Sequence, residues 1–187
     1  TYGAAAVAAG GEVLLRGICP SDLKVPLEEF QKAGAAVDAD EKNRQIRICM
    51  GKRPLPLLIK TEPYPGFPTD LQSPFMAFLA TAQGTSYIEE QVFEGRFATA
   101  KILEQMGAVI RTENQRAVIE GHYPLKGAAV NACDLRGGAA LMVAALAAEG
   151  DTFIGECHHI ERGYEDICRD MAALGAHIRW VENDFTR

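Results

Sequence analysis

The chain lacks the features that would point to a membrane, a disulfide scaffold or a nucleic acid. None of its 187 residues belongs to an uncharged apolar run of the roughly 18 to 20 residues that a bilayer-spanning helix needs. Its cysteines number 5, and none forms a CxxC pair, which favours free thiols in a reducing compartment. Lys and Arg number 19 against 25 Asp and Glu, and the net charge of -6 argues against nucleic-acid binding. No basic stretch followed by an apolar one marks a secretory leader, so we expect a cytoplasmic protein with no membrane or nucleic-acid partner.

Metal and phosphate-loop signatures are also missing. Cys157, His158 and His159 adjoin one another but match no zinc-ligand spacing, and neighbouring histidines in a strand would point to opposite faces. Gly137-Gly138 is not a phosphate loop, because no GxxxxGK[ST] is present. We therefore expect no metal and no cofactor. What remains is an ordinary globular composition, 48% hydrophobic and 24% charged, from which a core can form.

A unit of roughly 70 residues recurs about three times along the chain. In one pattern a helical run ends in small residues and glycine before a strand, and its glycines are Gly11, Gly84 and Gly150. In the other an apolar residue precedes Gly-Ala and a β-branched residue follows, and its glycines are Gly34, Gly107 and Gly175. The separation between the two patterns is nearly constant, which predicts approximate units 1-60, 61-125 and 126-187. Each glycine is expected to end its helix in the left-handed region.

The two helices predicted for each unit differ in kind. The stretches 135–148 and 74–82 are apolar nearly all round, which is typical of a helix buried on every side. The second helix is amphipathic, and in the third unit its apolar stripe is Ile167, Cys168, Met171 and Leu174. Strands such as 46–50 alternate apolar and polar residues and are expected to be half-buried. The pattern predicts an α/β fold in which strands surround central helices, the inverse of the usual sandwich.

A proline-rich stretch, YPGFPTDLQ (64–72), holds Asp70 near the start of a buried helix. One interpretation is capping, because Thr69 and Gln72 have capping-box spacing and Ser73-Pro74 offers a rival helix start. An acid in the first turn would then simply favour the helix dipole. The other interpretation is that Asp70 carries chemistry.

Two further stretches carry arginines. In CDLRGG (133–138) Asp134 again suits a helix cap, whereas Arg136 should meet a carboxylate, a phosphate or solvent, since an unpaired buried guanidinium is costly. In HHIERGYE (158–165) Arg162 precedes an amphipathic helix, where arginine suits an anion such as phosphate or carboxylate. The alternative for this last stretch is a solvated loop.

These stretches resemble a known family. YPGFPTDLQ, VFEGRF (92–97), ACDLRGGAAL (132–141) and HIERGYE (159–165) are similar, in this order, to the C-terminal part of UDP-N-acetylglucosamine 1-carboxyvinyltransferase. The resemblance implies an inside-out α/β barrel of three βαβαββ units, completed by a short N-terminal segment and accompanied by a second domain. The chain 1-187 would then be a single-domain fragment, incomplete at both ends, in which the N-terminal segment and the second domain are absent.

The resemblance also implies a reaction. Enzymes of this family transfer the enolpyruvyl group of phosphoenolpyruvate to the 3′-hydroxyl of UDP-N-acetylglucosamine and release phosphate, the first committed step of peptidoglycan synthesis. The partners would be these two substrates and the missing domain, and the fragment alone is expected to have no turnover. Two alternatives stay open: a shikimate-type enolpyruvyl transferase, and a non-catalytic ligand-binding repeat domain.

The implied site residues follow by matching positions. Asp70 matches the proposed base at the sugar hydroxyl, and Asp134 matches an aspartate implicated in proton transfer. The positions implied in substrate binding are Asp70, Val92, Phe93, Arg136 and Arg162, with the two arginines on the phosphoenolpyruvate side. The chain departs from the family at Gly95, where Asn is usual, and at Gly137-Gly138, which should loosen the first helical turn by about 0.5–1 kcal/mol per added glycine.

Overall fold

The structure is a computed structural model that describes residues 1–181, so the last six positions of the third predicted unit lie outside the described residues. Its α-helices are α1 (Tyr2–Ala9), α2 (Lys24–Lys32), α3 (Gln72–Leu79), α4 (Ala98–Gln105), α5 (Leu135–Ala145), α6 (His158–Glu161) and α7 (Ile167–Ala173). Two short 3-10 helices are η1 (Pro20–Leu23) and η2 (Thr69–Leu71). The strands are β1 (Glu12–Arg16), β2 (Ala36–Asp40), β3 (Gln45–Cys49), β4 (Leu58–Lys60), β5 (Thr85–Glu89), β6 (Val109–Glu113), β7 (Arg116–Glu120), β8 (Leu125–Lys126), β9 (Ala129–Asn131), β10 (Ala148–Glu149) and β11 (Phe153–Gly155).

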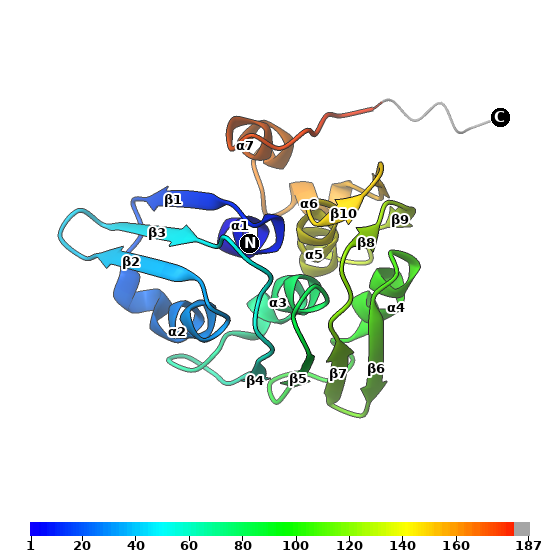
Figure 1. Cartoon of the computed structure of the whole chain (residues 1–187), viewed down its shortest axis with the longest axis horizontal. Coiled ribbons are helices and arrows are strands. Elements are labelled where there is room, and N and C mark those ends of the chain that lie inside the picture. The colour runs from blue at the N-terminus through cyan, green and yellow to red at the C-terminus, as the bar shows by residue number, and fades with distance from the viewer. Residues whose placement is uncertain (182–187) are drawn as a thin grey trace.

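Three helices, α1, α3 and α5, pack together at the centre, and the sheets surround them (Figure 1). Every residue of α3 is buried, as is the stretch 137–144 of α5. This confirms the prediction of helices apolar and buried on all sides. Both helices end three residues earlier than expected, because their last turns tighten into i→i−3 hydrogen bonds such as Ala82 N–H to the Leu79 carbonyl.

The strand order repeats from unit to unit. The first sheet runs β1-β3-β2 and the second β4-β5-β7-β6, so the last strand of each unit lies between the two before it. The β4–β5 pair is parallel and opens the second unit, and the parallel β9–β11 pair takes the same place in the third. The second unit therefore has the complete βαβαββ order. The predicted boundary at residue 60 falls at the end of β4, whose hydrogen bonds belong to the second unit's sheet.

Each long sheet turns one face to the central helices. In β3 the side chains of Ile46 and Ile48 are buried, whereas Arg47 between them is exposed. In β7, Ala117 and Ile119 are buried in the same way. This alternation is the half-buried pattern expected of strands with one solvated face.

The amphipathic helices lie outside this core. On α7 the residues Ile167 and Met171 are buried as predicted, but Leu174 is exposed. Its assignment to the apolar stripe is wrong, because α7 ends at Ala173 and Leu174 already lies in the turn that closes the helix.

Positive φ is found, as predicted, at Gly34, Gly84, Gly107, Gly150 and Gly175. The prediction that Gly84 and Gly150 end their helices is wrong, because α3 already ends at Leu79 and α5 at Ala145. In the first unit the left-handed residue is Gly10, with φ of 68°, and not Gly11. The helix ends one residue earlier there, because the Gly10 N–H already bonds back to the carbonyls of α1.

An aromatic cluster joins the first two units inside this core. The ring of Phe75 on α3 lies 4.7 Å from that of Phe30 on α2, 4.8 Å from Phe67 in the proline-rich loop and 4.8 Å from Phe78. Phe67 is thereby held to the core two residues before η2, where Asp70 lies. Within residues 1–181 no helix is long and apolar enough to cross a membrane.

Candidate functional site

Asp70 and Arg136 meet although they are 66 positions apart in the sequence. Asp70 lies in η2, just before α3, and Arg136 is the second residue of α5. Arg136 Nε donates to Asp70 Oδ1 over 2.5 Å. The side chains of Arg136 and Asp70 are 33% and 65% exposed, so the pair lies at the surface. The guanidinium therefore meets a carboxylate, one of the three partners that the sequence predicts for it.

The two capping interpretations of the proline-rich stretch are wrong. The Thr69 hydroxyl donates to Glu90 Oε2 over 2.8 Å, and Ser73 donates to the neighbouring Gln72 over 3.0 Å. No side chain caps α3 at its start. The chain enters α3 through η2, in which the Leu71 N–H bonds to the Pro68 carbonyl over 3.0 Å. This 3-10 turn takes the place of a side-chain cap.

Asp134 does cap its helix. Its Oδ1 accepts a hydrogen bond of 2.6 Å from the Gly137 N–H at the start of α5. The capping interpretation is confirmed for this aspartate, and the cap holds the first turn from which Arg136 reaches Asp70. A Cβ at Gly137 would come within 2.7 Å of Cys133 Sγ, so the glycine allows the turn to pack closely.

Arg162 is exposed and lies at the C-terminal end of the short helix α6. It precedes the amphipathic helix α7, as predicted, but the turn that closes α6 separates it from Asp166, the N-cap of α7. The Gly163 and Tyr164 N–H groups bond back to the Ile160 carbonyl and close α6, while α7 begins later, at Ile167.

Two close contacts hold this stretch against the first turn of α5. A Cβ at Gly163 would lie 2.7 Å from Leu135 Cδ1, and one at Gly138 would lie 2.4 Å from Ile160 Cγ1. The segment that carries Arg162 thus packs on the turn that carries Arg136. Gly138 and Gly163, which lack a Cβ, allow this approach.

Val92 and Phe93 follow β5 and are held by Glu90, a residue that none of the predicted site stretches contains. Their N–H groups donate to Glu90 Oε1 over 2.9 and 3.1 Å. Glu90 is 1% exposed. The signal for it was strand alternation: Ser86 and Ile88 on β5 face inward, so the next inward position is Glu90.

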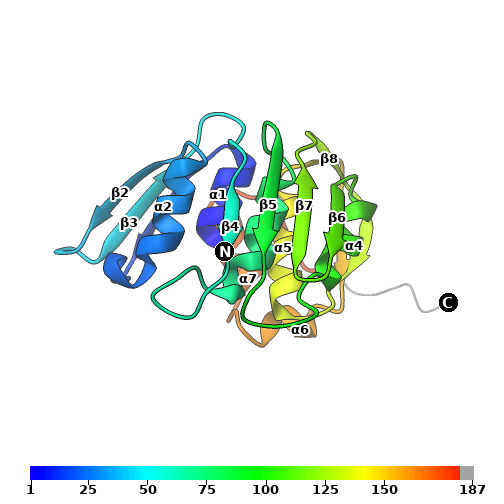
Figure 2. The same ribbon diagram turned by 90° about the horizontal axis from the view of Figure 1, so that it is seen from below.

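The loop 62–68, the segment after β5, and α6 gather at one end of the molecule (Figure 2). This end of the molecule, where α3 and α5 begin, carries four charged side chains of the predicted site. They are the carboxylates of Asp70 and Asp134 and the guanidiniums of Arg136 and Arg162. Such an arrangement can hold a doubly anionic ligand beside a group that accepts a proton.

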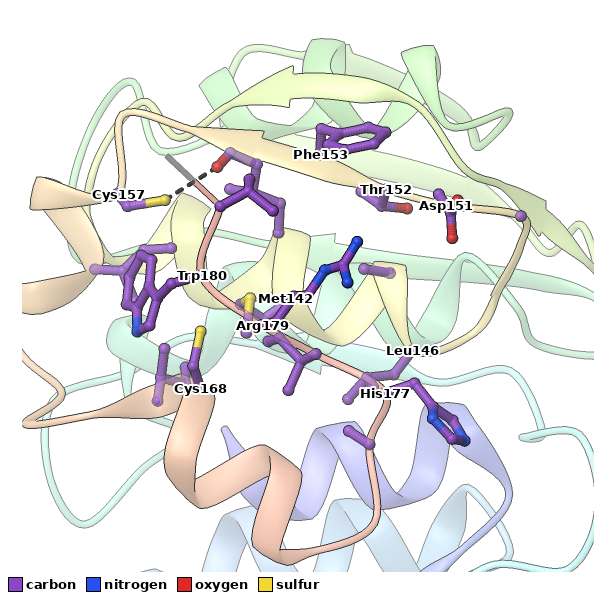
Figure 3. Close-up of a pocket in the computed structure, with 18 residues that line it drawn as sticks. Met142, Leu146, Asp151, Thr152, Phe153, Cys157, Cys168, His177, Arg179 and Trp180 are labelled. Carbon is purple, nitrogen blue, oxygen red and sulfur yellow. Dashed lines mark hydrogen bonds between the residues drawn. The ribbon is translucent and has the colours of Figure 1, made fainter. Parts of the chain in front are cut away.

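A groove of about 630 Å³ lies elsewhere, on the third unit, and no predicted site residue lines it (Figure 3). Its lining includes Met142, Phe153, Ile167, Ile178 and Trp180. Two thiols also line it, Cys157 and Cys168, and burial raises the pKa of both. Within residues 1–181 no three His, Cys, Asp or Glu side chains cluster as a metal site would need.

The family model described as EPSP synthase (3-phosphoshikimate 1-carboxyvinyltransferase) matches residues 1–171. A UDP-N-acetylglucosamine 1-carboxyvinyltransferase from Desulfofundulus thermocisternus is 46% identical over 178 residues, which are 95% of this chain and 72% of that relative. The chain belongs to this family of enolpyruvyl transferases. Inside the family its sequence lies among the UDP-N-acetylglucosamine 1-carboxyvinyltransferases.

Other members of the family are longer than the chain. It is 45% identical to UDP-N-acetylglucosamine 1-carboxyvinyltransferase 1 of Legionella pneumophila over 98% of its own length and 36% of that relative. It is 45% identical to enzyme 2 of Carboxydothermus hydrogenoformans over 98% of its length and 44% of that relative. The chain thus spans well under half of these two relatives.

Solved structures of enolpyruvyl transferases share the fold. The enolpyruvyl transferase NikO from Streptomyces tendae matches with a TM-score of 0.83 at 28% identity, over 94% of this chain and 42% of that one. An EPSP synthase from Acinetobacter baumannii matches with a TM-score of 0.62 at 19% identity, over 81% and 37%. The predicted α/β fold with central helices is therefore confirmed as the fold of these enzymes.

Proposed function

We propose that the whole protein containing this chain transfers enolpyruvyl from phosphoenolpyruvate to the 3′-hydroxyl of UDP-N-acetylglucosamine. The observation that carries the proposal is the Asp70–Arg136 contact of 2.5 Å, which joins the expected base to an expected phosphoenolpyruvate ligand. Relatives that bear this enzyme's name, 46% and 45% identical to the chain, support it. The proposal includes peptidoglycan synthesis as the pathway and the cytoplasm as the location.

The reaction proceeds by addition and then elimination. The sugar hydroxyl oxygen bonds to C2 of phosphoenolpyruvate while its proton goes to a base and C3 gains a proton. In the second step C3 loses a proton, and the bond between C2 and the phosphate oxygen breaks to release phosphate. The reaction therefore needs a base at the hydroxyl, an acid at C3 and cations at the phosphate and carboxylate.

The side chains at this end of the molecule meet those needs. Asp70 is exposed enough to reach the sugar hydroxyl as the base, and Val92 and Phe93 contact the UDP-sugar. Asp134 takes part in proton transfer. Arg136 and Arg162 bind phosphoenolpyruvate, because guanidiniums form charge-assisted, bidentate hydrogen bonds with phosphate and carboxylate.

The test is phosphate release by the full-length protein from phosphoenolpyruvate with either of two acceptors. We expect turnover with UDP-N-acetylglucosamine and none with shikimate 3-phosphate. The reverse preference would identify a shikimate-type enzyme, and binding without turnover of either acceptor would favour a non-catalytic ligand-binding domain.

The proposal also includes a missing segment and a second domain, so that this chain alone has no turnover. In the first two units the last strand lies between the two before it. In the third unit β11 has only β9 beside it within residues 1–181, and the groove separates β11 from the stretch 177–181. We propose that an extended segment from the N-terminal part of the same protein fills this groove as a strand with alternating apolar side chains.

Trp180 reports on this occupancy, since it is the only tryptophan of the chain, lines the groove and is exposed. A peptide of the protein's own N-terminal segment should shift its fluorescence to shorter wavelength. A peptide of the same composition in scrambled order is the control. An unchanged spectrum with the native peptide at saturating concentration would refute the assignment of the groove.

A further inference from the structure

Glu90 is a buried carboxylate that joins two segments of the site. Its Oε2 accepts from the Thr69 hydroxyl over 2.8 Å, and its Oε1 accepts from the Val92 and Phe93 N–H groups over 2.9 and 3.1 Å. Among residues 1–181 no lysine, arginine or histidine forms an ion pair with it. Three hydrogen bonds alone satisfy a carboxylate that is 1% exposed.

The two segments matter because each carries an expected substrate contact. Thr69 immediately precedes Asp70, whereas Val92 and Phe93 form the loop after β5. A second bond lies beside these, since the Gln91 N–H donates over 2.8 Å to the hydroxyl of Thr61, which follows β4 and forms a β-bridge with Phe67 of the proline-rich loop. The proline-rich loop and the loop after β5 are therefore fastened to each other beneath the surface.

We propose that Glu90 is a positioning residue that sets the distance between Asp70 and the loop that contacts the UDP-sugar. The inference rests on the proposed function, in which Asp70 takes the proton of a sugar bound by Val92 and Phe93. Glu90 touches neither substrate. It acts through Thr69 on the base and through the two N–H groups on the acceptor site, and displacement of such groups by about 1 Å can cost a hundredfold in rate.

The hydrogen-bond chemistry distinguishes two substitutions. Glu90→Ala leaves three part-buried donors without their acceptor. Glu90→Gln keeps an oxygen for the two backbone N–H groups and turns its NH2 toward Thr69, whose hydroxyl oxygen can accept. The amide therefore preserves the geometry, and the alanine destroys it.

Thr69→Val removes one of the three hydrogen bonds of Glu90, the one from the Thr69 hydroxyl to Oε2. It leaves the two hydrogen bonds from the Val92 and Phe93 N–H groups to Oε1. It perturbs the base without moving the loop after β5. Glu89→Gln is the matched control, because Glu89 adjoins Glu90 but faces the surface, where it pairs with Arg116 at 3.9 Å.

The experiment uses the full-length protein and measures kcat, both KM values and hydrogen exchange at the Val92 and Phe93 amides. For Glu90→Ala we expect the KM for UDP-N-acetylglucosamine to rise about tenfold and kcat to fall about ten- to hundredfold, with a smaller change in the KM for phosphoenolpyruvate. Exchange at both amides should accelerate. Thr69→Val should lower kcat and leave amide exchange slow, whereas Glu90→Gln and Glu89→Gln should resemble the wild type.

Two results would overturn the proposal: a folded Glu90→Ala protein with unchanged KM and exchange, or a Glu90→Gln protein as defective as Glu90→Ala. If Glu90→Ala does not fold, the other two variants still test the proposal. Thr69→Val must have a lower kcat than the wild type, and Glu90→Gln must have a kcat close to it. If the wild type transfers no enolpyruvyl group, the proposed function fails. In that case, fast exchange of the Val92 and Phe93 amides in Glu90→Gln would also overturn the positioning role of Glu90, and slow exchange of these amides would support it.

Discussion

The Asp70→Asn substitution is expected to remove a base from the site without weakening the fold. Asp70 contacts Arg136 at 2.5 Å, but its side chain is 65% exposed, so solvent screens the pair. Exposed ion pairs contribute about 0–1 kcal/mol to stability. Asparagine also keeps an oxygen that accepts from Arg136. We therefore expect the free energy of unfolding to change by less than about 1 kcal/mol.

The catalytic effect should be much larger. A positioned general base contributes about 10²- to 10⁴-fold to a rate. Each tenfold corresponds to about 1.36 kcal/mol of activation free energy, so the fall in kcat should correspond to roughly 2.7 to 5.4 kcal/mol. The assay is phosphate release by the full-length protein at saturating concentrations of both substrates, and urea unfolding measures stability in parallel.

The control is another acid at a helix start. Asp166 accepts from the Arg169 N–H over 2.9 Å and begins α7, but it belongs to no predicted site. Asp166→Ala should cost about 1 kcal/mol of stability and leave kcat unchanged. If Asp70→Asn kept kcat within about twofold of the wild type, the assignment of Asp70 as the base would be wrong. A destabilisation of more than about 2 kcal/mol would instead contradict the weak, solvent-screened ion pair with Arg136.

Three further predictions concern packing, capping and thiol reactivity. Phe75→Ala should lower the free energy of unfolding in urea by about 3–5 kcal/mol, whereas Phe93→Ala should lower it by less than about 1 kcal/mol; equal effects would contradict the aromatic cluster. Asp134→Ala should cost about 1 kcal/mol in thermal unfolding, and Asp134→Asn should restore most of it, because asparagine also caps; an alanine variant as stable as the wild type would argue against the cap. Burial raises the pKa of the Cys157 and Cys168 thiols, so their thiolate fraction at about pH 8 is smaller in the folded chain than in the unfolded chain. Iodoacetamide should therefore react with them more slowly in the folded chain than in urea. Equal rates in the two conditions at both thiols would contradict their burial in the groove.

Much of the architecture could be predicted from the sequence, because it depends on local periodicity. The stretch 74–82 is apolar nearly all round, so it must be covered on every side, while 46–50 alternates and needs cover on one face only. The copies of Gly-Ala after an amphipathic helix mark the same turn in each unit. Helix ends were less accurate, at Gly11, at Leu174 and at the ends of α3 and α5, because a shift of one to three residues leaves the apolar pattern unchanged.

The sequence by itself determined the repeat, the buried helices and the stretches that contain the site. It could not determine which partner each polar group takes. Thr69 has a local partner available in capping-box spacing, yet it bonds to Glu90, 21 positions away. Arg136 finds Asp70 across 66 positions. Only the packing of α3 against α5 and of the proline-rich loop against β5 brings these groups within hydrogen-bond distance. The buried carboxylate of Glu90 needs donors, whereas the start of α3 is served by the 3-10 turn η2 and needs no side-chain cap.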